Sequence, residues 1–321
     1  MDATAIYHDI AQRTGGDIYI GVVGPVRTGK STFIKRFMET MLIPRIPAEA
    51  VRQRARDELP QSAAGRTIMT TEPKFVPETA VSVELEGGGS FRARLIDCVG
   101  YMVPGAMGHE ENDKPRMVKS PWFDEEIPFD QAAETGTRKV ICEHSTIGLV
   151  ITTDGSISDI PREEYEEAEE RVIAELRETG RPFVMLLNCV EPQSAQAAAL
   201  AQRLGEKYAV PVLPVSCVDI TEGDIKGIIA SLLYQFPVRE VELDLPGWVT
   251  ALPADHWLLS AVLDTLRKVG DISKMCQVKP MLEAVVGCPY IRSVGVRQID
   301  LGSGRGQAEL TFDQGLFYRV L

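Results

Sequence analysis

A glycine-rich stretch near the amino terminus limits what this chain can fold into more than any other feature. Residues 21–37 read GVVGPVRTGKSTFIKRF, and Gly24, Gly29, Lys30 and Ser31 within them form the pattern G-x-x-x-x-G-K-[ST]. The pattern follows an apolar stretch with strand character and precedes a stretch with helical periodicity, which is the context that a phosphate-binding loop requires. The sequence therefore predicts a P-loop between the first strand and the first helix of an α/β domain.

Each part of this loop has a chemical role in binding a nucleotide. Gly24 and Gly29 let the backbone wrap closely, so that loop N–H groups and the helix amino terminus meet the phosphates. We expect Lys30 to bridge β- and γ-phosphate oxygens, and the Ser31 hydroxyl to help hold Mg²⁺. The other loop residues that we expect to contact the nucleotide are Arg27, Thr28 and Thr32.

Short apolar runs alternate with amphipathic helical stretches between residues 17 and 236. The strand candidates are 17–24, 91–100, 146–155, 181–188 and 210–216, and the helix candidates are 30–41, 130–144, 162–179, 194–208 and 222–234. The last four strands are rich in Val, Ile and Leu, as buried parallel strands are. The alternation predicts an α/β, GTPase-like P-loop NTPase fold, with a mainly parallel sheet and helices on both faces.

The pattern changes near Pro237, so we expect a P-loop domain at 1–237 and a second domain at 238–321. Beyond the boundary, a strand pattern covers residues 241–245, an apolar helical stripe covers 257–269, and residues 294–312 read as a hairpin closed by 302–306. These elements predict a smaller α+β domain, which we expect to be incomplete.

Composition limits the classes of partner and the location. The net charge of -12 argues against binding to a nucleic-acid backbone. Apolar runs such as 182–190 are far shorter than the roughly 20 residues that a bilayer span needs, and the start lacks the order of a secretory signal. We therefore expect a cytoplasmic protein that binds no nucleic acid.

We expect the cysteines and one acidic stretch to have structural roles and not functional ones. The six cysteines lack a CxxC pair, and we expect them to be buried free thiols. The acidic stretch 162–180 carries apolar residues at helical spacing, so we expect its glutamates to form a solvated helix face.

Two further elements supply candidate catalytic residues and Mg²⁺ ligands. Asp97 ends an apolar strand and Gly100 follows three residues later; this places a carboxylate at the carboxyl edge of the sheet, near the P-loop, although a cap is the alternative. Thr70 and Thr71 lie between the first helix and the next strand, where GTPase-like proteins place a threonine that closes on Mg²⁺ and the γ-phosphate. The alternative is a β-branched pair that enters a strand.

The order of these elements resembles that of the translation-factor-related GTPases, but the base-reading motif differs. Where that class has Asn-Lys-x-Asp, this chain has Asn188, Cys189, Val190 and Glu191. Loss of the lysine stem and of the aspartate should relax the preference for guanine. Asn188 is kept, and Ser216 is a second candidate to border the base.

Two other positions also depart from that class. Tyr101 stands where Ras-type GTPases carry the glutamine that orients water, and tyrosine cannot do the same. Arg27 stands where potassium-dependent relatives place asparagine. Its guanidinium could reach phosphate in cis as an arginine finger does, or it could be an outward surface arginine.

Longer stretches of this chain resemble the stage IV sporulation protein A family. They include residues 57–77, 95–108, 137–155 and 166–173, and the resemblance runs from Met1 to about Trp257. It implies slow, Mg²⁺-dependent ATP hydrolysis and polymerisation into the basement layer of the spore coat, in the mother-cell cytoplasm at the forespore outer membrane. It also implies partners: further copies of the chain, a small amphipathic anchoring peptide (stage V sporulation protein M) through which the membrane surface is reached, and other coat proteins. The carboxy-terminal region of the family is absent from the sequence.

A long proline-rich connection, residues 101–129, is consistent with a role in assembly, because long irregular connections are usually functional or disordered. Trp122 and Phe123 within it suggest an anchor for a partner; packing against its own domain is the alternative. We interpret the chain as an ATPase whose hydrolysis drives assembly. A reversible regulatory GTPase is the main alternative, and a small-molecule kinase would need an acceptor site that the sequence does not show.

Overall fold

The computed structural model describes Asp9, Gln12 and residues 17–60, 72–84, 90–108, 110–111, 114–253 and 255–320. The chain divides into two compact units, Met1–Leu232 and Leu233–Leu321. In the described part of the chain, every helix is too short or too polar to cross a bilayer.

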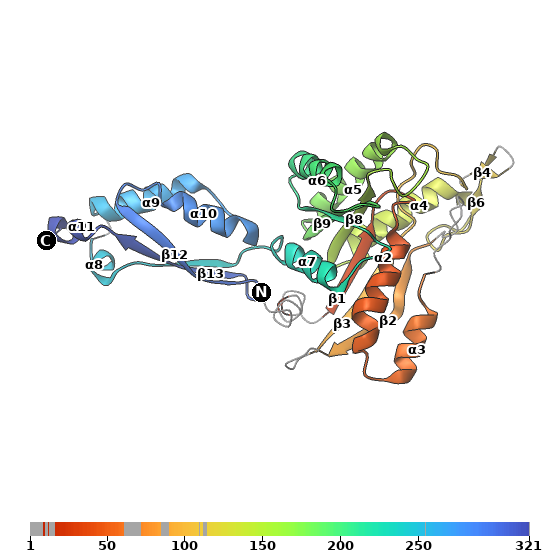
Figure 1. The fold of residues 1–321 in the computed structure, drawn as a ribbon, viewed down its shortest axis with the longest axis horizontal. Helices are drawn as coiled ribbons and strands as arrows, with labels where there is room; N and C mark the ends of the chain where they lie inside the picture. The colour runs from red at the N-terminus through yellow and green to blue at the C-terminus, as the bar shows by residue number, and fades with distance from the viewer. Residues whose placement is uncertain are drawn as a thin grey trace. The chain divides into compact units, whose positions relative to one another are not determined.

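A six-stranded sheet forms the centre of the first unit (Figure 1). Its strands lie in the order β10 (Val212–Val215), β9 (Phe183–Asn188), β8 (Ile147–Thr153), β1 (Asp17–Val23), β3 (Ser90–Asp97) and β2 (Lys74–Glu84). All neighbouring strands are parallel except β2, which runs antiparallel to β3 at one edge. The prediction of a mainly parallel α/β sheet is confirmed.

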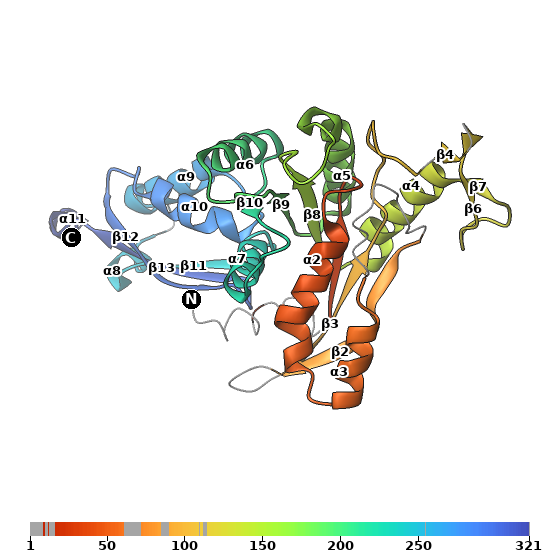
Figure 2. The same ribbon diagram turned by 45° about the vertical axis from the view of Figure 1, so that its right-hand side comes forward.

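Helices cover both faces of this sheet. They are α2 (Lys30–Phe37), α3 (Glu49–Asp57), α4 (Phe129–Lys139), α5 (Glu166–Thr179), α6 (Ala195–Tyr208) and α7 (Glu222–Leu233). Short π-helical turns extend α2 over Met38–Leu42 and α4 over Val140–His144. The helix α2 lies against β1 and β3, and α5 lies against β8, as the two views in Figure 1 and Figure 2 show.

Alternation of side chains along the strands explains the two helical layers. Leu149 on β8 lines a small apolar space together with Phe37 of α2 and Ile229 of α7. The next residue, Val150, belongs to a core cluster with Val172 of α5, on the opposite face. Every residue of β8 and of β9 is buried, as in strands covered on both sides.

The connection between β3 and α4 folds into two short hairpins, β4 (Glu110–Glu111) with β5 (Lys114–Pro115) and β6 (Met117–Val118) with β7 (Ile127–Pro128). The Trp122 ring lies over Gly136 of α4, where an added Cβ would be 3.2 Å from it. Trp122 therefore packs against its own domain, which was the alternative to an anchor, whereas Phe123 is 37% exposed.

The second unit is a three-stranded sheet with helices. Its strand order is β11 (Glu240–Asp244), β13 (Arg305–Phe312) and β12 (Ile291–Asp300), and its helices are α8 (Gly247–Thr250), α9 (Trp257–Val269), α10 (Val278–Val285) and α11 (Gln314–Val320). The predicted hairpin is the antiparallel pair β12–β13, while β11 pairs with β13 in parallel. Leu258, Val262 and Leu310 are fully buried in its core.

Two of the structural expectations need correction. Cys98, Cys189, Cys217 and Cys288 are buried free thiols, but Cys142 and Cys276 are exposed. The acidic face of α5 is not wholly solvated, because Glu169 is completely buried.

Candidate functional site

The glycine-rich loop lies at the carboxyl edge of the sheet, between β1 and α2, and its two motif glycines are sterically required. Gly24 has φ +141°, and a Cβ there would lie 2.2 Å from the Ile151 carbonyl oxygen on β8. Gly29 has φ +92° directly before α2, and a Cβ there would lie 2.4 Å from Nδ2 of Asn188. The loop can therefore pass this close to β8 and to Asn188 only as glycine.

Three hydrogen bonds hold the loop in place from outside the motif or within it. The Val26 N–H donates to the Tyr101 carbonyl oxygen at 2.9 Å. The buried Thr28 hydroxyl donates to the Pro25 carbonyl oxygen at 3.0 Å. The Asn188 Nδ2 donates to the Thr28 carbonyl oxygen, also at 3.0 Å. These three bonds therefore fix the backbone of the loop from Val26 to Thr28.

Lys30 is the first residue of α2 and is buried inside the loop. Its Nζ donates to the carbonyl oxygens of Pro25 at 2.5 Å and Gly24 at 3.4 Å. Burial lowers the pKa of Lys30, and the neighbouring Asp97 opposes this shift. Gly100, with φ +98°, passes so close that a Cβ there would lie 2.6 Å from the lysine Nζ. The ammonium is therefore held among the loop residues that would surround a phosphate.

Ser31 and Asp97 form the second half of the site. The Ser31 Oγ donates to Asp97 Oδ2 at 2.6 Å, across 66 residues of sequence. Asp97 ends β3, beside Val22 of β1, and is 3% exposed. Burial raises the pKa of this carboxyl, while the Ser31 hydrogen bond and the Lys30 charge lower it.

The other carboxylate oxygen of Asp97, Oδ1, is buried and has no hydrogen-bond partner among the described residues. An unpaired carboxylate oxygen beside a serine hydroxyl suits a hard cation with oxygen ligands, so Ser31 and Asp97 fit Mg²⁺. The described residues contain no group of three or more His, Cys, Asp or Glu placed to hold a metal. Phosphate and water oxygens are further ligands that Mg²⁺ would take at such a site.

The Asn188 side chain links two loops. Its Nδ2 binds the nucleotide-loop carbonyl of Thr28, and its Oδ1 accepts from the Cys217 N–H at 3.0 Å. Ser216 precedes that amide, and its hydroxyl donates to Asp219 at 3.0 Å. Asn188 thus joins the P-loop to the loop that follows β10, and Ser216 lies in this second loop.

Cys189 and Glu191, which stand in place of the guanine-reading lysine and aspartate, differ in exposure to solvent. Cys189 is buried, with its Sγ near the Leu187 and Val215 carbonyl oxygens, and burial raises its pKa to about 11. Glu191 is exposed, as is Val190. Cys189 therefore offers no stem to stack on a base.

The Tyr101 side chain packs inside its own domain. It is buried, its hydroxyl donates to Glu175 on α5 at 2.5 Å, and the Arg171 guanidinium lies 4.2 Å from its ring centroid. The next residue back, Gly100, donates its N–H to the Thr137 hydroxyl on α4 at 3.2 Å. No sequence signal pointed to Glu175 or Thr137, because both lie on helices far along the chain.

The structure therefore brings together the predicted residues Gly24, Thr28, Gly29, Lys30, Ser31, Asp97 and Asn188. Thr32 follows Ser31 on α2 and is half-buried, as is Arg27 in the loop. Thr70 and Thr71 lie outside the described residues.

These features define the class of the first unit: a mainly parallel α/β domain that carries the sequence G-x-x-x-x-G-K-[ST] between its first sheet strand and the following helix. The chain belongs to the stage IV sporulation protein A family. The family model for the ATPase domain matches residues 1–237, and the model for the middle domain matches residues 238–321.

Curated relatives agree with this assignment. The chain is 52% identical to stage IV sporulation protein A of Bacillus subtilis (strain 168) and 51% identical to that of Bacillus anthracis, over its whole length. It is 48% identical to that of Clostridioides difficile (strain 630), over 98% of the chain. The chain spans 65% of the length of each of these relatives.

Proposed function

We propose that the chain binds ATP with Mg²⁺ and hydrolyses it slowly, and that hydrolysis drives self-assembly into a static scaffold, the basement layer of the spore coat on the forespore surface. The observation that carries this proposal is the group formed by Lys30, Ser31 and Asp97 at the carboxyl edge of the sheet. The match to an ATPase-domain model supports the reaction.

Each residue of this group has a defined task in the proposed reaction. Lys30 binds the β- and γ-phosphates, for which its ammonium is already held inside the loop. Ser31 and Asp97 hold Mg²⁺ through the serine hydroxyl and the unpaired Oδ1. When bound, Mg²⁺ neutralises phosphate charge and fixes the phosphates for attack by water. Thr70 or Thr71 is assigned the contact to the γ-phosphate from the motif order alone.

The choice of ATP over GTP follows from the surroundings of the base-reading motif. The buried thiol of Cys189 faces backbone carbonyls and has no stem that could stack on guanine. The missing aspartate removes the acceptor that selects guanine. A preference for adenine over guanine is the expected result.

The assembly part of the proposal rests on the family resemblance. Further copies of the chain, a small amphipathic membrane-anchoring peptide (stage V sporulation protein M) and other coat proteins are the proposed partners, with the membrane surface reached indirectly from the mother-cell cytoplasm. The net charge of -12 supports the absence of nucleic acid from this set.

A reversible regulatory GTPase-type switch is the alternative function, and the order of the motifs, which resembles that of the translation-factor-related GTPases, favours it. Phosphate release from ATP and from GTP by the purified chain distinguishes the two, with competition binding of both nucleotides and sedimentation of the full-length protein read in parallel. We expect ATP to be preferred and ATP hydrolysis to precede sedimentation. About tenfold tighter binding of GTP would instead support the switch.

A further inference from the structure

Arg27 has an unusual backbone conformation for its residue type. Its φ is +62°, and among the described residues only Ala209 shares a positive φ without being glycine. This conformation costs an L-residue roughly 1 kcal/mol, a cost that glycine would avoid. Strained backbone of this kind persists where neighbouring contacts fix it, and it concentrates at functional sites.

The contacts on both sides of Arg27 fix its backbone. Val26 is held by its N–H bond to Tyr101, and Thr28 by its hydroxyl bond to Pro25 and by Asn188. The Arg27 side chain is half-buried and lines a pocket of about 190 Å³. The other lining residues are Pro104, Gly105 and Met107, which follow Gly100, and Asp159, Ile160, Pro161 and Glu164, which follow β8.

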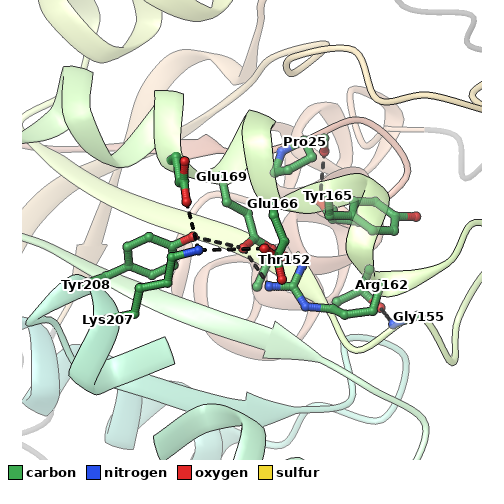
Figure 3. Close-up of polar contacts among 12 residues, drawn as sticks. Pro25, Thr152, Gly155, Arg162, Tyr165, Glu166, Glu169, Lys207 and Tyr208 are labelled. Atoms are coloured by element: carbon green, nitrogen blue, oxygen red, sulfur yellow. Dashed lines mark hydrogen bonds and ion pairs between the residues drawn. The ribbon is translucent and has the colours of Figure 1, made fainter. Parts of the chain in front are cut away.

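Residues 159–164, which form one side of this pocket, are held in place by a buried ion pair, which Figure 3 shows. The Arg162 guanidinium binds both carboxylate oxygens of Glu169, at 2.5 and 2.6 Å, and the Thr152 hydroxyl on β8 also donates to Glu169. Tyr165, the next residue along the chain, is buried and lies near enough to Arg27 that the arginine charge opposes the rise of its pKa caused by burial. The side of the Arg27 pocket formed by residues 159–164 is therefore held in place by buried contacts.

Given the proposed ATP hydrolysis, on which this inference rests, we propose that Arg27 is a catalytic residue whose guanidinium contacts the γ-phosphate in the transition state. Arg27 lies in the same eight-residue loop as Lys30. Hydrogen bonds within the loop hold the backbone that carries the long Arg27 side chain. An arginine supplied by the P-loop itself takes the role that an arginine finger has in other phosphoryl-transfer enzymes. In this structure the side chain lies in the pocket that the carboxylates of Asp159 and Glu164 line, so the guanidinium must turn out of this pocket to reach the γ-phosphate.

The reaction step is hydrolysis. The oxygen of water forms a bond to the γ-phosphorus, and the bond from that phosphorus to the β–γ bridging oxygen breaks, with its electron pair leaving on ADP. The proton of the attacking water ends on the inorganic phosphate. Negative charge on the bridging and equatorial oxygens is what the Arg27 guanidinium would stabilise, beyond Lys30 and Mg²⁺.

Three variants of the full chain test this assignment: Arg27→Gly, Arg27→Lys and the matched control Ala209→Gly. Both glycine variants relieve a positive φ, but only Arg27→Gly removes a guanidinium. We measure thermal unfolding, affinity for ATP, affinity for ADP with aluminium fluoride as a transition-state mimic, and single-turnover phosphate release with and without added guanidinium.

We expect Arg27→Gly to keep its melting temperature, because the larger entropy that glycine loses on folding offsets the strain it relieves. It should also keep its ATP affinity but lose about 10³-fold in hydrolysis and at least about tenfold in affinity for the mimic. Guanidinium should restore part of the rate, Arg27→Lys should be intermediate, and Ala209→Gly should match the unchanged chain. If Arg27→Gly hydrolyses ATP and binds the mimic normally, Arg27 is structural and the inference is wrong, whereas the proposed ATPase stands. A wild-type chain that neither binds nor hydrolyses ATP overturns both.

Discussion

Gly100→Ala should displace the nucleotide-binding loop from its support. An added Cβ would lie 2.3 Å from the Gly24 carbonyl oxygen, 2.6 Å from the Lys30 Nζ and 3.0 Å from the Pro25 carbonyl carbon. The first of these distances is about 1 Å short of an ordinary van der Waals contact. Because two of the three atoms belong to backbone, the loop itself would have to move.

The size of the effect follows from two contributions. The positive φ of Gly100, +98°, costs alanine about 1 kcal/mol, and overpacking a buried contact costs about 1–3 kcal/mol more. The total, about 2–4 kcal/mol, is a large share of the roughly 5–15 kcal/mol that stabilises a domain. Movement of Lys30 with the loop should also weaken ATP binding.

Gly180→Ala is the matched control. Gly180 ends α5 with φ +66°, and an added Cβ there has no neighbour within 4 Å. It therefore carries the conformational cost without the overlap. Urea unfolding followed by circular dichroism, with ATP binding measured on the same samples, should show a clearly larger loss for Gly100→Ala, and a loss of ATP affinity in that variant alone. Equal losses of stability, with ATP affinity unchanged in both, would show that Gly100 does not support the loop.

Two further outcomes concern the phosphate and the metal ion. Lys30→Ala should cost at least about 2 kcal/mol of ATP binding, about thirtyfold in Kd by equilibrium titration; affinity equal to that of the unchanged chain would remove the P-loop assignment. Asp97→Asn should bind ATP but lose Mg²⁺-dependent turnover. Burial raises the pKa of Asp97 above its usual 3.8, so the folded protein loses stability as pH rises through this raised pKa and the carboxyl ionises. Without Mg²⁺, Asp97→Asn should therefore have a higher melting temperature than the unchanged chain near neutral pH. In acid its melting temperature should be no higher. Replacing Thr70 and Thr71 together by alanine should leave ATP binding nearly intact but abolish hydrolysis, and full-length protein with both changes should stay soluble; polymer formation without hydrolysis, read by sedimentation, would refute the coupling.

The sequence predicted the parts of the site that depend on local spacing. Lys30 and Ser31 follow from the motif, and Asp97 follows from the rule that parallel strands end at one edge of a sheet. It did not predict the partners that hold these parts. Thr137 binds the Gly100 N–H from a helix 37 residues away, and no periodicity in sequence reports such a contact.

The missed elements have similarly physical explanations. The helix α3 has only one buried residue, Ala55, so no apolar stripe marks it. The strand β2 pairs with β3 irregularly between Val76 and Val81, which interrupts the alternation that would identify it. Glu169 lies four residues after Tyr165, hence on the apolar face of α5, and Arg162 makes its burial possible.

The two hydrogen bonds of the Asn188 amide have an evolutionary consequence. The side chain connects one backbone group to another, Thr28 to Cys217, and so serves the protein irrespective of which base is bound. Selection on the nucleotide can therefore change Cys189 and Glu191 without touching Asn188. We expect proteins descended from such an ancestor to keep this asparagine when their preferred nucleotide changes, because its side chain connects two loops.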